Sequence, residues 1–228
     1  MNPIYCAFDT TDVSAARSLA HALDGLIGGV KLGLEFFTHN GPDGVRAVLG
    51  DAVLPLFLDL KFHDIPNTVA GAVRGILPLN PRFTTIHAGG GRAMMRAAVD
   101  AAEGRTRILA VTLLTSLGEG DLPGLGLAGT VSDQVRRLAD LAQEAGVDGL
   151  VCSAHEVAVL RRQLGTAMTL VVPGIRPAGS AQDDQVRVLT PAEALRAGAT
   201  HLVIGRPITA AANPAEAAKA ILAGLESL

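Results

Sequence analysis

The chain has 228 residues, of which 49% are hydrophobic and 18% are charged, and this composition is typical of a globular protein rather than a disordered polyelectrolyte. Its formal net charge is -3 and it has no basic block, so we expect no nucleic acid partner and no membrane surface as a partner. Because no stretch approaches about 18 consecutive apolar residues and the first residues do not resemble a signal peptide, we expect a cytoplasmic location.

Eight apolar runs, each short enough to be a strand, follow one another along the chain. They cover residues 4–9, 28–33, 54–61, 83–88, 107–114, 149–154, 169–175 and 201–206. The runs are continuous rather than alternating, as in parallel strands covered on both faces. Segments with helical spacing separate them, and Thr190-Pro191 and Asn213-Pro214 are typical helix starts. The pattern predicts a single-domain α/β protein, a (β/α)₈ TIM barrel over residues 1–228, rather than an open sheet.

The two cysteines, Cys6 and Cys152, lie in different apolar runs. Neither belongs to a CxxC pair or to a cluster with the spacing of metal ligands. Free cysteine behaves as a small buried hydrophobe. We therefore expect both to be buried, with no disulfide and no metal site.

Polar residues follow most of the apolar runs, and in a (β/α)₈ barrel the carboxyl ends of the strands build the active site. The residues at these positions are Asp9, Lys31, Asp59, Lys61, Asp64, His87, Thr112, Thr115, Ser153, Arg176, Gly205 and Arg206. His87 precedes three glycines and is interpreted as a structural histidine. The irregular segments 115–131 and 176–190 follow the fifth and seventh runs, and loops of this length in a compact barrel are usually functional.

Lysine is rare in this chain, since the 19 basic residues include only Lys31, Lys61 and Lys219. Asp59 and Lys61 are two residues apart, so in an extended strand they point to the same side with Cα atoms roughly 6.6 Å apart. Lys31 and Asp64 can join them in an array of ammonium and carboxylate groups. One interpretation is a structural salt-bridge network. The other is a proton donor, which the preference for arginine elsewhere favours, because lysine can release a proton and arginine cannot.

Glycines and arginines follow the last two apolar runs, in VPGIRPAG and VIGRP. Gly174 and Gly205 let backbone N–H groups approach an anion, and the loops after the seventh and eighth strands form the usual phosphate pocket of this fold. Arg206 supplies the counter-charge. Two such motifs at consecutive strand ends favour a phosphate site over glycines that only form turns.

The segment DLKFHDIPNT at 59–68 resembles the signature D-x-K-x-x-D-I-P-x-T of the orotidine 5′-monophosphate decarboxylase family. Other segments resemble this family in the same order along nearly the whole chain. They are AFD at Asp9, KLG at Lys31, HAGGG at 87–91, AVTLLTS at 110–116, VCSAHE at 151–156, PGIRPAGS at 173–180 and VIGRPIT at 203–209. Their order and spacing are similar to those of the compact bacterial branch of the family.

The resemblance implies decarboxylation of orotidine 5′-monophosphate to UMP and CO2 in de novo pyrimidine biosynthesis, by a homodimer that uses no cofactor. It implies that Lys61 protonates C6 of the pyrimidine and that Lys31, Asp59 and Asp64 complete the catalytic network. The implied substrate-binding residues are Asp9, Lys31, Asp59, Ile65, Pro66, Thr68, Thr115, Arg176, Gln185, Gly205 and Arg206. Asp9 and Lys31 would contact the ribose, and Asp64 and Thr68 would reach into the site of the other subunit.

Two alternatives stay open. A related barrel that decarboxylates sugar phosphates shares the D-x-K-x-x-D motif but uses magnesium; DIPNT and the long segment 176–190 fit the nucleotide enzyme better. A non-catalytic phosphate-binding barrel would be expected to keep the glycines and arginines of the last two strands while losing the lysine and acids of the third.

Overall fold

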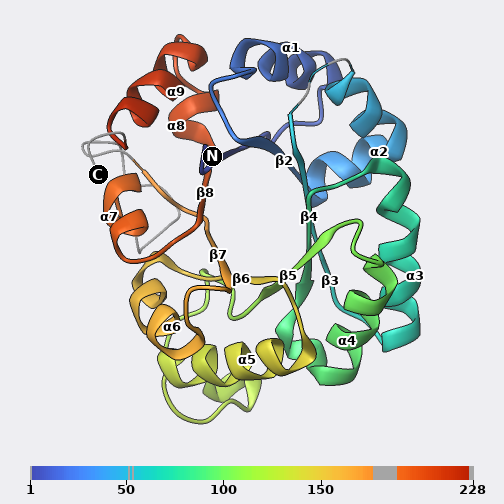
Figure 1. The fold of residues 1–228 in the computed structure, drawn as a ribbon, viewed down its shortest axis with the longest axis vertical. Coiled ribbons are helices and arrows are strands. Elements are labelled where there is room, and N and C mark those ends of the chain that lie inside the picture. The colour runs from blue at the N-terminus through green and yellow to red at the C-terminus, as the bar shows by residue number, and fades with distance from the viewer. Residues whose placement is uncertain (1, 51, 53, 177–188, 226–228) are drawn as a thin grey trace.

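The computed structural model describes residues 2–50, 52, 54–176 and 189–225. Within them the eight predicted strands are all present and form one parallel sheet closed into a barrel (Figure 1). The strands are β1 (Ile4–Ala7), β2 (Gly29–Gly33), β3 (Leu56–Phe62), β4 (Phe83–His87), β5 (Arg107–Val111), β6 (Gly149–Val151), β7 (Thr169–Val172) and β8 (His201–Ile204). They pair in chain order, and β8 pairs with β1. The predicted (β/α)₈ barrel is confirmed.

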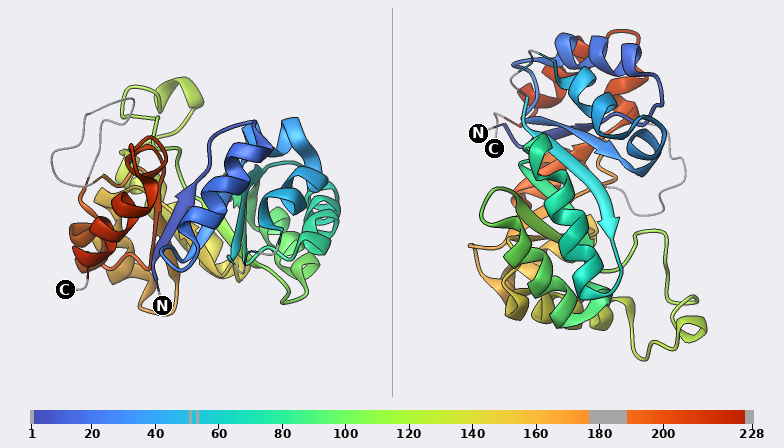
Figure 2. Two further views of the ribbon diagram at one scale, coloured as in Figure 1. Left: turned by 90° about the horizontal axis from the view of Figure 1, so that it is seen from above. Right: turned by 90° about the vertical axis from the view of Figure 1, so that its right-hand side faces the viewer.

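Helices follow the strands and surround the barrel (Figures 1 and 2). They are α1 (Val13–Leu23), α2 (Leu34–Leu49), α3 (Pro66–Ile76), α4 (Gly91–Ala102), α5 (Val131–Ala145), α6 (Val157–Leu164), α7 (Pro191–Arg196), α8 (Arg206–Thr209) and α9 (Pro214–Ala223), with the 3₁₀ helices η1 (Leu77–Leu79), η2 (Ala88–Gly90), η3 (Pro123–Leu125) and η4 (Ala154–Glu156). Thr190 and Asn213 cap α7 and α9, so both predicted helix starts are confirmed. The segment that contains η3 projects away from the barrel (Figure 2).

Six of the eight strands end before their apolar runs do, among them β5 and β6. β5 ends at Val111 and β6 at Val151, whereas the runs extend to residues 114 and 154. After β6 the chain turns because Ser153 forms a capping box with Glu156 at η4. Cys152 and Ala154 are nevertheless buried against the helices. Apolar character thus persists past the point where strand pairing stops.

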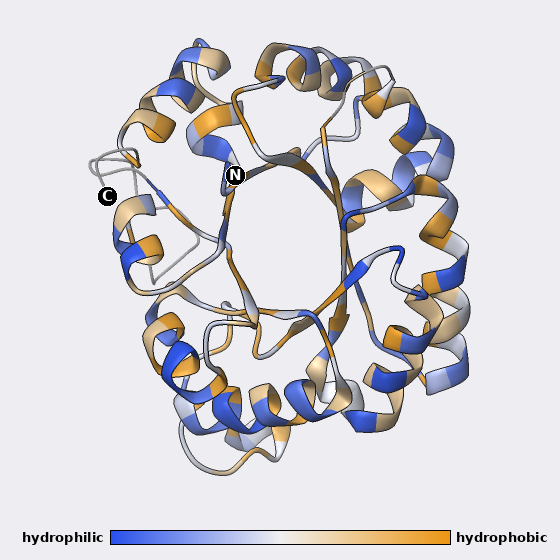
Figure 3. Ribbon diagram, in the orientation of Figure 1, coloured by the Kyte–Doolittle hydropathy of each residue, from blue (hydrophilic) through white to orange (hydrophobic). Residues whose placement is uncertain are grey.

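The core has two parts, one between the barrel and the helices and one inside the barrel. The helices carry both hydrophilic and hydrophobic residues, as expected for elements with one covered face (Figure 3). The interior part consists of Tyr5, Ala7, Phe57, Phe83, Leu109, Val171 and Val203. Cys6 and Cys152 are free and buried, as predicted.

An aromatic cluster inside the barrel includes the ring of His201. This ring lies 5.6 Å from that of Tyr5 and 5.1 Å from that of Phe83, both in edge-on contacts. Burial, together with the smaller effects of the nearby Arg82 and Arg107, lowers the pKa of His201 to about 4. Burial also raises the pKa of the Tyr5 hydroxyl to about 12. Both side chains are therefore neutral at pH 7.

Candidate active site

A cavity of about 290 Å³ lies where the strands end. It is lined by Ala7, Asp9, Lys31, Phe57, Asp59, Lys61, Thr115, Val151, Pro173, Gly174, Ile175, Arg176, Val203, Gly205, Arg206 and Pro207. Eight of the residues that the family resemblance assigns to the site belong to this set, and so does Gly174. Ala7, Phe57 and Val203 also belong to the interior core, so the core forms part of the cavity wall.

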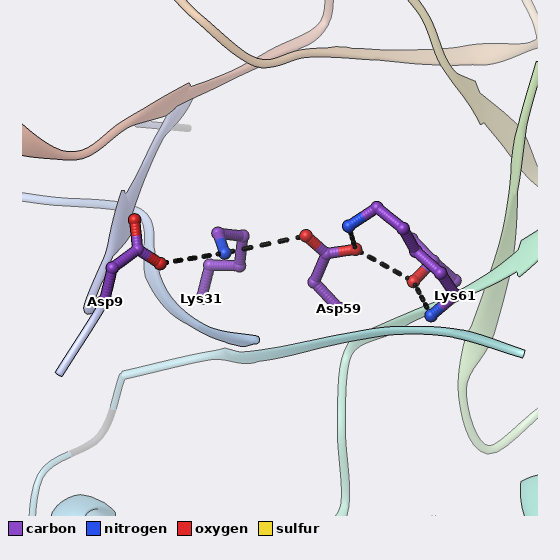
Figure 4. Close-up of polar contacts among 5 residues, drawn as sticks. Asp9, Lys31, Asp59 and Lys61 are labelled. Carbon is purple, nitrogen blue, oxygen red and sulfur yellow. Dashed lines mark hydrogen bonds and ion pairs between the residues drawn. The ribbon is translucent and has the colours of Figure 1, made fainter. Parts of the chain in front are cut away.

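Four charged side chains alternate in sign at this cavity (Figure 4). Lys31 Nζ lies 3.5 Å from Asp9 Oδ1 and 3.5 Å from Asp59 Oδ2. Lys61 Nζ donates a hydrogen bond of 2.8 Å to Asp59 Oδ1. The two carboxylate oxygens of Asp59 therefore face different ammonium groups, and Lys61 ends the row.

Two opposing effects set the ionisation of Asp59. Burial acts to raise the pKa of its carboxyl, whose side chain is only 14% exposed. Lys31, Lys61 and a hydrogen bond from Thr85 act in the other direction and outweigh burial, so the pKa lies below its ordinary value. Asp59 is therefore a carboxylate at neutral pH.

Lys61 lies at an irregularity in β3. Leu58 pairs with Thr84, and Phe62 pairs with Ile86, so between these pairs β3 has three residues where β4 has only Thr85. Lys61 has a φ of 49°, a left-handed conformation that is uncommon for residues other than glycine. The prediction of a regular extended strand from Asp59 to Lys61 is thus wrong in detail. Their side chains still meet, because the bulge redirects the ammonium group of Lys61 toward Asp59.

Thr85 of β4 is a further member of this site, and the sequence did not predict it. Its hydroxyl accepts a hydrogen bond of 2.9 Å from the backbone N–H of Lys61 and donates one of 3.0 Å to Asp59 Oδ1. Thr85 is fully buried and is not among the residues that line the cavity. Its sequence signal is only a threonine at an inward position of a strand, which many core threonines share.

The residues after β7 and β8 line the same cavity, as predicted. Arg176 and Arg206 are both among its lining residues, and Arg176 is 9% exposed. Gly174 has a φ of 73°, a conformation in which a side chain is strained. Guanidinium groups beside accessible backbone N–H groups are suited to binding a phosphate.

Four predicted residues lie outside this cavity within the described chain. Asp64, Ile65, Pro66 and Thr68 are exposed between the end of β3 and the first turn of α3. Asp64 Oδ1 accepts a hydrogen bond of 2.6 Å from the backbone N–H of Ile65. The described residues of one chain thus bring together Lys31, Asp59 and Lys61 but not Asp64. Gln185 lies outside the described residues.

His87 packs against another histidine. Its ring centroid lies 5.3 Å from that of His63. Burial lowers the pKa of His87, and His63 and Lys61 lower it further. His87 is not among the residues that line the cavity, which agrees with the structural interpretation.

Metal-ligating side chains are dispersed in the part of the chain that the structure describes. No group of three or more His, Cys, Asp or Glu residues is arranged there to hold a metal ion. The helices of the same residues are too short or too polar to cross a membrane.

Comparison with known proteins places this geometry in a family. Residues 2–221 match the model of the Orotidine 5'-phosphate decarboxylase / HUMPS family. The orotidine 5′-phosphate decarboxylase of Rhodospirillum rubrum is 56% identical, with 96% of this chain and 92% of that protein covered. That of Paramagnetospirillum magneticum is 54% identical, with 99% of each covered. The crystal structure of orotidine 5′-phosphate decarboxylase from Lactobacillus acidophilus has a TM-score of 0.87 at 34% identity, with 99% of each chain covered. The chain therefore belongs to the orotidine 5′-phosphate decarboxylase / HUMPS family.

Proposed function

We propose that this chain is a carboxy-lyase that converts orotidine 5′-monophosphate to UMP and CO2 in de novo pyrimidine biosynthesis. The observation that carries the proposal is the ammonium group of Lys61, held by Asp59 at a cavity that also presents Arg176 and Arg206. The relatives from Rhodospirillum rubrum and Paramagnetospirillum magneticum are named for this activity. The match extends over 92% and 99% of their length.

In the proposed reaction the bond between C6 and the carboxyl carbon breaks and CO2 leaves. The electron pair stays at C6 in an sp² orbital that the pyrimidine ring delocalises poorly. The Lys61 ammonium group stabilises this pair and transfers a proton to C6, which gives UMP. Lys61 then regains a proton from solvent, so that one proton is consumed for each CO2 released. No cofactor takes part in these steps.

The row of alternating charges, Asp9, Lys31, Asp59 and Lys61, would affect the bound substrate and the transition state of this reaction differently. In the bound substrate the carboxylate at C6 would lie close to Asp59, whose charge is maintained by Lys31 and Lys61. As CO2 departs, the negative charge moves away from Asp59 and toward Lys61. Both changes favour the transition state over the ground state, which is the requirement for catalysis.

The rest of the substrate would be held by residues around the row. Asp9 and Lys31 would bind the ribose hydroxyls, and Thr115 would contact the pyrimidine. Arg176, Gly205 and Arg206 would bind the 5′-phosphate together with Gln185, which lies outside the described residues. Binding energy from the phosphate can assist the reaction at C6 without contact with that carbon.

The proposal includes a homodimer in which Asp64 and Thr68 of the partner subunit complete the cavity. Support comes from the exposure of this segment, in which Ile65 is 66% exposed. Leu34, which follows the neighbouring strand β2, is 55% exposed. Exposed apolar side chains of this kind suit a protein interface. Neither a nucleic acid nor a membrane is a proposed partner, and the proposed location is the cytoplasm.

The direct test is the ultraviolet absorbance of orotidine 5′-monophosphate, which changes when the conjugated carboxylate is lost. We expect the purified protein to abolish the substrate spectrum and generate that of UMP, at the same rate before and after treatment with EDTA. A folded dimer that leaves the absorbance unchanged would contradict the proposal. Activity on a keto-gulonate phosphate that requires magnesium would support the sugar-phosphate alternative instead.

A further inference from the structure

The hydroxyl of Thr85 connects the backbone of Lys61 to the carboxylate that holds the Lys61 side chain. We propose that Thr85 is a positioning residue that fixes the Lys61 ammonium group and the Asp59 carboxylate relative to each other for proton transfer. This inference rests on the proposed function and deepens it, because it concerns the same site and adds a residue that does not face the cavity.

The direction of each hydrogen bond is fixed by chemistry. The backbone N–H of Lys61 can only donate, and the ionised carboxylate of Asp59 can only accept. Thr85 Oγ1 must therefore accept from Lys61 and use its single proton for Asp59 Oδ1. That oxygen also accepts from Lys61 Nζ. The contacts form a closed ring in which both the backbone and the side chain of Lys61 take part.

The bulge in β3 explains why a side chain is needed at this point. Between the Leu58–Thr84 and Phe62–Ile86 pairs, the extra residues of β3 have no regular backbone partners on β4. The hydroxyl of Thr85 provides an acceptor for the Lys61 N–H in this gap. Lys61 is thereby held at a φ of 49°, a strained conformation that persists only when its surroundings stabilise it.

The burial of Thr85 makes its hydroxyl hard to replace. Thr85 is fully buried, so no water can replace its hydroxyl without a cavity opening in the barrel. Thr84, the preceding residue, is equally buried, but its hydroxyl has no hydrogen-bond partner among the described residues. The two threonines are therefore a matched pair: they have the same residue type and the same burial, and they differ in their contact with the site.

The test compares Thr85→Val, which removes the hydroxyl with little change in volume, with Thr84→Val. For Thr85→Val we expect kcat to fall by about 10- to 100-fold, because small displacements of reacting groups have effects of this size. The affinity for UMP should stay within about twofold, since Thr85 does not line the cavity. The acid side of the kcat profile should move to higher pH, because Asp59 keeps Lys31 and Lys61 but loses one donor to its charged form. Thr84→Val should match the wild type in all three measurements.

Thr85→Ser separates positioning from packing, because it keeps the hydroxyl and loses only a methyl group. We expect it to retain kcat within about fivefold and to keep the wild-type pH profile; a serine variant as slow as Thr85→Val would overturn the proposal. Thr85→Ala removes the same hydroxyl and takes the place of Thr85→Val in this comparison if Thr85→Val does not fold. A folded variant that lacks the hydroxyl but has the wild-type kcat and pH profile would overturn the role of Thr85 and leave the proposed function standing. No turnover by the wild type would overturn the proposed function itself.

Discussion

At Lys61 the chain combines a group that can release a proton with a counter-charge that keeps it in place. We predict that Lys61→Ala folds and binds UMP but loses turnover by about 10³-fold or more, since it removes both the proton donor and the positive charge beside C6. Turnover would be measured by the absorbance assay and UMP affinity by calorimetry.

The matched control is Lys219→Ala. Lys219 lies on α9 and pairs with Glu216 at the surface, where its side chain is 55% exposed. Its removal should leave kcat unchanged. If Lys61→Ala kept a tenth of the wild-type kcat, Lys61 would not be the proton donor.

His201 carries a prediction about stability at low pH. Its pKa is lowered from 6.5 in the unfolded chain to about 4 in the fold. Above pH 6.5 both states are neutral and the full stability is present. As the pH falls from 6.5 to 4, the unfolded chain binds a proton that the folded chain does not, so the free energy of unfolding should fall by about 2 kcal/mol. Urea denaturation at pH 7 and pH 4.5 measures this loss.

The comparison variant for this measurement is His201→Asn, which does not titrate in the range. The other acids and histidines titrate in both proteins, so the difference between their pH dependences isolates His201. We expect a weaker pH dependence in the variant. Equal slopes would show that His201 takes up its proton in the folded state as readily as in the unfolded chain.

At the scale of the elements, the side chain of Arg161 joins α6 to two of the connections between helices and strands. Arg161 donates hydrogen bonds to the carbonyl oxygens of Gly165 and Met168, in the connection from α6 to β7, and of Gly198, in the connection from α7 to β8. Arg161→Ala removes these donors at once and should lower the free energy of unfolding by about 2–3 kcal/mol. Chemical denaturation measures the change.

The neighbouring Arg162 provides the control for this prediction. Arg162 is exposed on the same helix, and Arg162→Ala should change stability by less than about 0.5 kcal/mol. Arg161→Lys keeps one charge but cannot reach all three carbonyl groups, and it should lie between the two alanine variants. Similar stabilities for the alanine variants would contradict the role of Arg161.

The strand β3 shows which features of an element the sequence predicts and which it does not. The apolar run predicts the strand, and its two charged residues predict that Asp59 and Lys61 meet. The bulge was not predictable, because LFLDLKF has no glycine to mark a residue with positive φ and because its stabilising partner, Thr85, lies 24 residues away. Such a contact depends on the register between two strands, which no local pattern specifies.

The whole barrel was predictable because each βα unit repeats the same signal. Continuous apolar runs, helix starts and the polar residues after each run all support one architecture. That architecture also brought Asp9, Lys31 and Arg206 together, although they are far apart in the chain. The segment with Asp64 and Thr68 could be assigned only through the family resemblance, because its partner would be a second subunit.

The proposed dimer leads to a prediction at the scale of the assembly. Ile65→Asp places a charge at the centre of the exposed segment, so we expect a monomer in analytical ultracentrifugation. Its kcat/KM should fall by about 100-fold or more, because Asp64 and Thr68 of the partner subunit would no longer reach the cavity. Activity should recover in part at high protein concentration.

Leu125→Asp is the control, since Leu125 is 56% exposed on η3, in the segment that projects away from the barrel (Figure 2). It should leave the mass and the activity as in the wild type. A dimeric, fully active Ile65→Asp protein would contradict the proposed interface.

The interior core and the cavity share Ala7, Phe57 and Val203, and this sharing restricts how the protein can adapt. A substitution that reshapes the cavity at these positions also disturbs the close-packed barrel, so each gain in a new specificity would carry a loss of stability. Among the cavity residues in the loops after the strands, Asp9 and Thr115 belong to neither part of the core. New substrate preferences should therefore arise in the loops, while the barrel residues beneath the cavity resist change.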